Sequence, residues 1–138
     1  MATGDRAAYE AMICKKLRDA KVVPFKTVAL RDWKPVENGC HPNVDKWVRS
    51  TPGHSAVRGW VFYKRCFIPV ERSLGYEFTA HSVVRDENGV LFDITPVHPE
   101  NLRPSMRFIP HPGDEDVFWK IEKSDRCICC PSSDHERP

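Results

Sequence analysis

YEFTAHSVVRDENGVLFDI, residues 76–94, predicts two β-strands joined by a tight turn. Apolar and β-branched residues dominate both flanks, and Asn88-Gly89 between them is a strong hairpin signal. The strand-like texture continues on both sides of this segment. The predicted strands are Ala56–Tyr63, Tyr76–Val84, Val90–Ile94, Met106–Ile109 and Val117–Ile121. We therefore expect an antiparallel sheet in the second half of the chain.

Two amphipathic helices are expected ahead of this sheet. Residues 5–21 place apolar side chains at helical spacing, and Pro24 closes the segment. A second helix is expected over Cys40–Val48, with Pro42 at a permitted position in the first turn. The inward faces are Tyr9, Met12, Ile13, Leu17 and Ala20 in the first helix and Val44, Trp47 and Val48 in the second. Helices followed by an antiparallel sheet predict an α+β fold.

Length and charge narrow the class of protein. The 138 residues suffice for one domain, which we place at residues 1–125, followed by a Cys-rich, flexible tail at residues 126–138. The net charge of +2 does not predict the concentrated basic surface that nucleic acids or anionic membranes require. Apolar runs fall far short of the ~20 residues that span a bilayer, and Met1–Arg6 lacks the features of a secretory signal. We expect a cytoplasmic protein with no nucleic-acid or membrane partner.

Six cysteines are present, and without an export signal they are expected to be reduced thiols rather than disulfides. Three of them crowd the tail, together with a histidine, which is the composition of a soft-metal or redox site. Adjacent cysteines do not match the usual spacing of structural zinc ligands, so we favour a flexible tail over a zinc site. The cysteines are Cys14, Cys40, Cys66, Cys127, Cys129 and Cys130, and the tail histidine is His135.

Three residues have the chemistry of a nucleophilic site. Cys40 begins the second predicted helix, where unpaired amides and the positive end of the helix dipole favour a thiolate. His81 lies in one strand of the hairpin and Asp93 in the other. An imidazole beside the thiol can hold the thiolate and protonate a leaving amine, while a carboxylate fixes the tautomer of that imidazole. Each residue also has an ordinary structural explanation, as a packed thiol, a core histidine or a turn cap.

The hairpin offers a geometric condition on this triad. His81 and Asp93 share a face of the sheet only if the loop between their strands holds an odd number of residues, because the sum of their numbers, 81 and 93, is even. A five-residue loop, Arg85–Gly89, puts His81 directly opposite Asp93. A three-residue loop, Glu87–Gly89 with Gly89 in the left-handed region, makes them diagonal neighbours on one face. Loops of two or four residues would separate them.

The same motifs resemble the core of the transglutaminase-like and papain-like cysteine hydrolase superfamily. The resemblance covers roughly residues 38–96 and rests on Cys40 at a helix start, on the strand Thr79–Val84, and on Val90–Pro96 after the Asn-Gly turn. It implies a papain-like or transglutaminase-like core, with Cys40 as nucleophile, His81 as general base and acid, and Asp93 as orienting carboxylate. CHPNVDKW, residues 40–47, is also similar to the nucleophile helix of protein N-terminal glutamine amidohydrolases. The chain departs from the superfamily pattern at Gly39, where an aromatic residue often precedes the nucleophile.

Residues around the triad are candidates for substrate binding, each with an alternative. His41 follows the nucleophile directly, and with Cys40, His81 and Asp93 it offers a mixed donor set for zinc or iron. Asn43 has the chemistry of an oxyanion donor, although helix capping is its usual task, and the first amides of the helix are better placed for that hole.

A second substrate-binding candidate lies in the first strand of the sheet. Trp60 is either a core anchor or a wall of the substrate cleft, with the core favoured. Gly59 beside it predicts a bulge or the close approach of another chain.

The leading functional hypothesis is a small cysteine hydrolase that acts on an amide bond, as a protein glutamine deamidase, amidase or peptidase, through a thioester and without a cofactor. Its partner would be a protein or peptide substrate. The alternatives are a non-catalytic protein-binding module that buries Cys40 and a small metal-binding protein with Cys and His ligands.

Overall fold

The computed structural model of the chain describes residues 3–68, 73–124 and 127–131. It is an α+β fold, as the sequence predicts. Its helices are α1 (Thr3–Lys15), α2 (Cys40–Ser50) and α3 (Glu115–Ser124), with 3-10 turns η1 (Leu17–Asp19) and η2 (Glu100–Ser105). Its strands are β1 (Lys21–Val22), β2 (Ser55–Ile68), β3 (Ser73–Arg85), β4 (Leu91–Phe92), β5 (Arg107–Pro110) and β6 (Cys127–Pro131).

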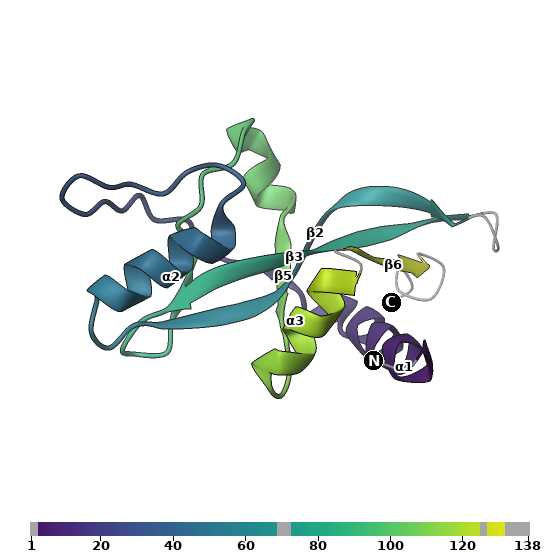
Figure 1. Cartoon of the computed structure of the whole chain (residues 1–138). Coiled ribbons are helices and arrows are strands. Elements are labelled where there is room, and N and C mark those ends of the chain that lie inside the picture. The colour runs from purple at the N-terminus through teal and green to yellow at the C-terminus, as the bar shows by residue number, and fades with distance from the viewer. Residues whose placement is uncertain (1–2, 69–72, 125–126, 132–138) are drawn as a thin grey trace.

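The strands form one sheet in the order β1-β5-β2-β3-β4, with β6 also paired to β3. All of these strand pairs are antiparallel. The long β2–β3 hairpin runs the length of the molecule, with α2 at one end and α1 and α3 together on one side (Figure 1). The predicted antiparallel sheet is therefore confirmed.

The turn between β3 and β4 has the three-residue form. Val84 pairs with Phe92 and Arg85 with Leu91, so continuing the register places residue 86 opposite residue 90. The amide of Asp86 donates to Val90, and Gly89, at φ +83°, donates back to Asp86. Only this loop length, among those considered, makes positions 81 and 93 diagonal neighbours. The odd-loop condition for the triad is met.

The main core lies between the sheet and the pair α1 and α3. Strand side chains alternate between faces, so Trp60 of β2 and Phe78 of β3 point to the same side, where they meet Phe118 of α3. The inward positions predicted for the first helix are confirmed, since Met12 packs against this core and the other four are buried in it. The helix is shorter than the predicted residues 5–21, because α1 ends at Lys15 and Leu17 and Ala20 follow it. The buried members of the cluster are Tyr9, Ile13, Cys14, Leu17, Ala20, Trp60, Phe78, Ile109, Phe118, Ile121, Ile128 and Cys130.

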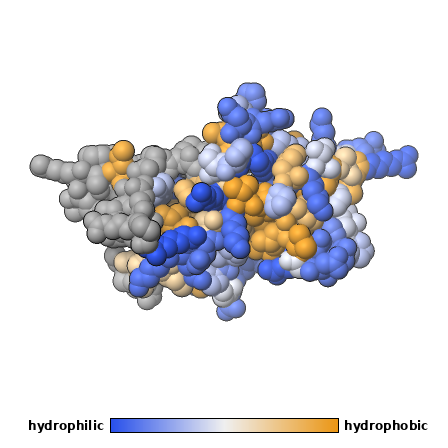
Figure 2. Space-filling model, turned by 180° about the vertical axis from the view of Figure 1, so that it is seen from behind, coloured by the Kyte–Doolittle hydropathy of each residue, from blue (hydrophilic) through white to orange (hydrophobic). Residues whose placement is uncertain are grey.

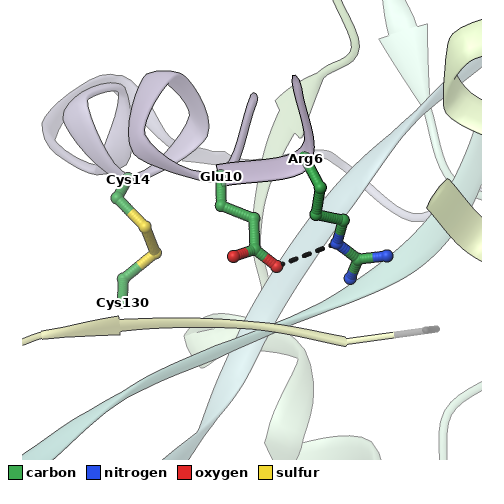
Figure 3. Close-up of a disulfide and its surroundings, with 4 residues drawn as sticks. All are labelled: Arg6, Glu10, Cys14 and Cys130. Atoms are coloured by element: carbon green, nitrogen blue, oxygen red, sulfur yellow. Dashed lines mark hydrogen bonds and ion pairs between the residues drawn. A yellow bond between two sulfur atoms is a disulfide. The ribbon is translucent and has the colours of Figure 1, made fainter. Parts of the chain in front are cut away.

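A disulfide joins this core to the end of the described chain. Cys14 of α1 is bonded to Cys130 of β6, beside the Arg6–Glu10 ion pair on the same helix (Figure 3). The expectation of reduced thiols is therefore wrong for these two residues. They stand 116 positions apart in the sequence, and only the packing of α1 against β6 brings their sulfurs together.

Two smaller clusters cover the remaining surfaces of the sheet. Val44 of α2 packs with Val84, Phe92 and Ile94, and Trp47 and Val48 contact the same group, as the second predicted helix face requires. On the other side, residues from η2 and its flanks cover the sheet. That cluster consists of Val23, Val57, Val61, Val83, Met106 and Phe108, with Leu91, Val97 and Leu102 against it.

Hydrophobic residues also reach the surface. Seen from behind, apolar residues gather near the middle of the molecule between hydrophilic borders (Figure 2). The large hydrophobic side chains that are exposed are Val22, Phe25, Val36, Leu74 and Val90. Among the described residues, no helix combines the length and apolar character needed to cross a membrane.

Two predictions about secondary structure are wrong. Val117–Ile121, expected as a strand, is part of α3, because Val117, Phe118 and Ile121 share one helical face against the core. Residues 127–131, assigned to a flexible tail, form β6, which pairs with β3 from Gly75 to Thr79 and buries Ile128. The rest of that predicted tail, residues 126 and 132–138, lies outside the described residues.

Candidate functional site

The site forms where β3 changes its neighbour. Along one edge of β3, β6 pairs with residues 75–79 and β4 pairs with Val84 and Arg85. The first turn of α2 lies against the stretch between these two pairings, because Cys40 is hydrogen-bonded to His81 and His41 to Ser82. Consecutive residues of β3 point to opposite faces. The start of one helix therefore reaches both faces of the sheet at this point.

Cys40, His81 and Asp93 come together as a triad. His81 Nε2 lies 2.7 Å from Asp93 Oδ2, and Cys40 is hydrogen-bonded to the same imidazole. Since Nε2 faces the carboxylate, Nδ1 is the ring nitrogen left for the sulfur. Cys40 is half-buried, whereas His81 and Asp93 are buried. This is the order thiol, imidazole, carboxylate that nucleophilic acyl transfer requires.

Asp93 is held on every side. Its Oδ1 accepts the amide of Thr95 at 3.0 Å, and its Oδ2 accepts Arg103 at 3.1 Å in addition to His81. Its backbone is also fixed, by hydrogen bonds to Pro24 and Lys26 in the segment after β1. The carboxylate that orients His81 therefore belongs to a rigid frame.

The charges of the triad are those of an ion pair. Burial by itself would raise the pKa of Cys40, but hydrogen bonds with His41 and His81 and the positive charge of these imidazoles lower it to about 6. Burial opposes a charged His81, yet its hydrogen bonds to Asp93 and Cys40, and their negative charges, raise its pKa to about 10. Burial also disfavours the Asp93 carboxylate, but His81, the Thr95 amide and Arg103 hold its pKa below the usual range. Between these values the thiolate–imidazolium form prevails.

The triad opens into a cavity of about 270 Å³. Cys40 and His81 lie in its wall, so the sulfur is accessible rather than sealed in hydrocarbon. The lining combines polar residues with aliphatic ones, several of which come from η2 and its flanks. The remaining lining residues are Glu37, Asn38, Val61, Thr79, Ala80, Thr95, Pro96, Val97, His98, Leu102 and Met106.

A glycine lies opposite His81 in the sheet. Gly59 of β2 pairs with His81 on one side and with Pro110 of β5 on the other. A Cβ at this position would stand 2.2 Å from the backbone oxygen of Ile109 and 2.7 Å from the ring of Phe108. The β5 segment of the same chain therefore approaches Gly59 closely, and this lets Phe108 lie edge-on to His81.

The other candidate residues have different positions. His41 adjoins the nucleophile, is hydrogen-bonded to it, and contacts Ser82 and the rings of Phe118 and Trp119. Trp60 is fully buried and donates to the Tyr9 hydroxyl, so it is the core anchor and not a cleft wall.

Asn43 neither caps α2 nor faces the cavity. Gly39 is the N-cap of this helix, while the buried Asn43 amide bonds both backbone groups of Val36 and the hydroxyl of Thr95. Asn43 thereby ties the loop before Cys40 to the segment after Asp93. The expectation that Asn43 and Trp60 contact substrate directly does not agree with these positions.

The proposed metal-binding alternatives gain nothing from the structure. Within residues 3–68, 73–124 and 127–131, no group of three or more His, Cys, Asp or Glu side chains is arranged to hold a metal ion. Cys130 is bonded to Cys14 and is not available as a tail ligand. The side chains of Cys127 and Cys129, and the whole of His135, lie outside the described part of the chain.

Sequence reasoning missed three polar residues that support the site. Arg103 holds Asp93, and Arg58 and Ser82 form a buried hydrogen bond beside His41. The sequence could have indicated Ser82, because it is the residue directly after His81. Arg103 and Arg58 lack such a signal, because an arginine in a loop or a strand usually faces solvent.

Comparison with known proteins adds no relative: no protein-family model, no curated protein sequence and no solved structure matches this chain.

Proposed function

We propose that the protein is a cysteine hydrolase that cleaves an amide bond through a thioester on Cys40. The observation that supports this most strongly is the accessible Cys40 thiol, which has a pKa lowered to about 6 and is hydrogen-bonded to His81. A structural thiol in a core has no need of a charged imidazole braced by a buried carboxylate. The same observation disfavours a binding module in which Cys40 is only a packing residue.

The first half of the reaction forms the thioester. The Cys40 thiolate attacks the amide carbonyl carbon, and the new C–S bond gives a tetrahedral oxyanion. His81, protonated at Nδ1, then delivers that proton to the amide nitrogen as the C–N bond breaks. The amine or ammonia leaves, and the acyl group remains on the sulfur. Asp93 keeps the Nε2 hydrogen of His81 in place throughout.

Water completes the cycle. His81, now neutral, accepts a proton from a water molecule whose oxygen attacks the thioester carbon. The C–S bond breaks, the carboxylic acid leaves, and the proton on His81 restores the ion pair with the Cys40 thiolate. No other reactant is needed, and each proton that His81 gives in the first half it regains in the second.

The start of α2 supplies donors for the oxyanion. The first amides of a helix have no acceptor within it, and Pro42 at the third position has no amide hydrogen. The amide of Asn43 is already bonded to Gly39. The amides of Cys40 and His41 are therefore the backbone donors at this helix end that suit a carbonyl oxygen under attack at the Cys40 sulfur.

The cavity supports a substrate of modest size. Its volume of about 270 Å³ lies below the range of about 300–1,000 Å³ that drug-sized ligands occupy. Such a space suits one amino-acid side chain or a short piece of peptide. We therefore favour a protein or peptide substrate, with the amide at a glutamine side chain or in the backbone, and neither a nucleic acid nor a membrane as partner.

The resemblance to the transglutaminase-like and papain-like superfamily agrees with this proposal at its motifs. The helix–strand–strand order of Cys40, His81 and Asp93 is the order that the superfamily implies, so we include a papain-like or transglutaminase-like core in the proposal. The cytoplasmic location expected from the sequence stays a prediction. The Cys14–Cys130 disulfide argues against it, since such bonds persist mainly in oxidising compartments.

The proposal is tested by measuring turnover of a defined set of peptides and by trapping the acyl adduct on Cys40. The protein is incubated with a peptide library containing glutamine, asparagine and free and blocked termini, and mass spectrometry records backbone cleavage and hydrolytic deamidation, in which OH replaces NH₂ for a net gain of about 1 Da. We expect one of these reactions, together with a hydroxylamine-sensitive acyl adduct on Cys40. Cys40→Ala and His81→Ala should abolish both signals.

His54→Ala is the matched control for the histidine. His54 contacts Trp47 and Glu87, away from the cavity, so its variant should retain turnover. If the unmodified protein turns over none of the peptides, or if Cys40→Ala is as active as the parent, the proposal is wrong.

A further inference from the structure

A second hydrogen-bonded chain reaches the Cys40 sulfur from the side opposite to Asp93. It begins at Arg58 of β2, whose Nη1 donates to Ser82 Oγ at 2.8 Å. Ser82 is in turn hydrogen-bonded to His41 Nδ1, and His41 is hydrogen-bonded to Cys40. Arg58, Ser82 and His41 do not belong to the triad, although His41 is hydrogen-bonded to the same Cys40 side chain as His81.

The directions of these bonds follow from the donors. A guanidinium only donates, so Ser82 Oγ is an acceptor toward Arg58. The single hydroxyl hydrogen of Ser82 is then available for His41 Nδ1, which accepts it when that nitrogen carries no hydrogen. A neutral imidazole that accepts at Nδ1 carries its hydrogen at Nε2. Since Nδ1 faces Ser82, Nε2 is the nitrogen left for the sulfur, and its N–H donates to the thiolate.

Besides its bond to Ser82 of β3, Arg58 is fixed by two helices. Its Nη2 donates to Asp45 of α2 at 2.6 Å and its Nε to Glu115 of α3 at 2.8 Å. The guanidinium also lies 5.1 Å from the ring centre of Trp119. These contacts leave Arg58 only 9% exposed, so the donor at the start of the chain has one defined position.

We propose that Arg58 and Ser82 are positioning residues that hold His41 as an Nε2–H donor to the Cys40 sulfur. This inference rests on the proposed function, and it divides the work between the two histidines. His81 moves protons, whereas His41 keeps its proton and stabilises the thiolate when Cys40 attacks and when it leaves the thioester. Because His41 is not the proton donor of the reaction, its N–H contribution persists after His81 has given up its proton.

Several charged or titratable groups surround this chain and enter any pH dependence. They are Glu37 and His98 of the cavity wall, Asp45 of α2, Arg58 of β2, His81 of β3, Asp93 after β4, Arg103 of η2 and Glu115 of α3. Within the described part of the chain, His41 and His81 are the residues hydrogen-bonded to Cys40. Substitutions at His41 therefore test the second chain while leaving the triad in place.

The experiment uses two readouts that need no substrate. Nitrogen-15 spectra of the imidazoles at pH 8 report the tautomer of His41, which we expect to be Nε2–H in the parent protein and a mixture in Ser82→Ala. The rate of iodoacetamide alkylation of Cys40 against pH reports thiolate formation. In His41→Phe we expect the midpoint to rise by about one pH unit, so that alkylation is about tenfold slower well below the midpoint.

His41→Gln and Ser50→Ala are the comparison variants. Glutamine retains an N–H donor at the end of the side chain, so it should recover part of the alkylation rate lost in His41→Phe. Ser50 lies at the far end of α2 and bonds only its own helix, so Ser50→Ala should behave as the parent. A role confined to packing would not distinguish phenylalanine from glutamine in this way.

Three results would overturn the inference: an Nδ1–H tautomer in the parent protein, a doubly protonated His41 at pH 8, or coincident alkylation profiles for the parent and a folded His41→Phe. If His41→Phe does not fold, the tautomer of the parent and of Ser82→Ala decides. Failure of the proposed function is a separate result, because it is the absence of turnover on amide substrates while both readouts can still be measured.

Discussion

Replacing Asp93 by asparagine tests the triad with the smallest change of shape. The Thr95 amide needs an acceptor at Oδ1, so the carbonyl of the new side chain must stay there and its NH₂ must take the place of Oδ2. That NH₂ then faces two donors, His81 Nε2 and Arg103 Nη1. His81 can relieve the conflict only by accepting at Nε2, which moves its hydrogen to Nδ1 in the neutral form.

This change of tautomer removes the proton acceptor of the reaction. With Nδ1 already protonated and Nε2 turned to the amide, neutral His81 cannot take a proton from water beside the Cys40 thioester. The corresponding swap in a serine-histidine-aspartate triad lowers kcat about 10⁴-fold, or about 5 kcal/mol in activation free energy. We expect a loss of about that size for amide turnover by Asp93→Asn.

The thiol should respond as well. With its pKa at about 6, Cys40 is about 90% thiolate at pH 7, and a pKa two units higher would leave about 9%. Loss of the Asp93 charge removes the main support for protonated His81, so the ion pair weakens and the pKa of Cys40 rises. We expect iodoacetamide alkylation at pH 7 to fall about tenfold, in a variant that loses no more than about 3 kcal/mol in urea unfolding.

Asp86→Asn is the control, because it makes the same chemical change in the same hairpin. Asp86 Oδ1 accepts the amides of Asn88 and Val90 in the turn, and the asparagine oxygen accepts them equally well. This variant should keep the alkylation profile and the turnover of the parent. If Asp93→Asn folds and alkylates as Asp86→Asn does, then Asp93 does not orient His81 and the reasoning fails.

Three further outcomes are expected. Turnover of a peptide amide should rise with pH through about 6 as Cys40 loses its proton and fall through about 10 as His81 loses the proton that the leaving amine takes; a rate that stays flat across pH 5–7 would contradict the ion pair. Gly59→Ala should destabilise the fold by about 3 kcal/mol in urea unfolding, since its Cβ would collide with the β5 backbone, and a parent-like midpoint would show that β5 can move. Tyr9→Phe should cost about 1–3 kcal/mol by the same assay, because the hydroxyl accepts the buried indole N–H of Trp60 at 2.7 Å, and no loss would mean that this donor finds another partner.

The sequence predicted the parts of this fold that depend on neighbours in the chain. The β3–β4 hairpin was predictable, since Asn88-Gly89 restricts the turn and the parity of its loop decides which side chains share a face. For the same reason His81 and Asp93 were predictable as a pair. The start of α2 at Cys40 was predictable from Pro42 and the apolar positions that follow.

The parts that were missed depend on tertiary contacts. Val117–Ile121 is rich in residues that favour strands, yet it forms part of α3 because one helical face of the segment is buried against Trp60. The partners of Cys14 and Arg58 come from distant segments. Arg58 lies in a strand where an arginine ordinarily faces solvent, and its burial follows only once α2 and α3 bring Asp45 and Glu115 to it.

The edge of β3 explains why the candidate site forms where it does. A helix start has free amides and a positive dipole end, but it can lie beside a strand only where that strand edge is not taken by another strand. β4 ends at Phe92, and β6 begins its pairing at Thr79, so α2 meets β3 between them. At that position the alternation of β3 puts His81 on one face and Ser82 on the other. One helix end is thereby supplied with two different hydrogen-bonded chains, and a longer β4 or β6 would remove the site without changing any of its residues.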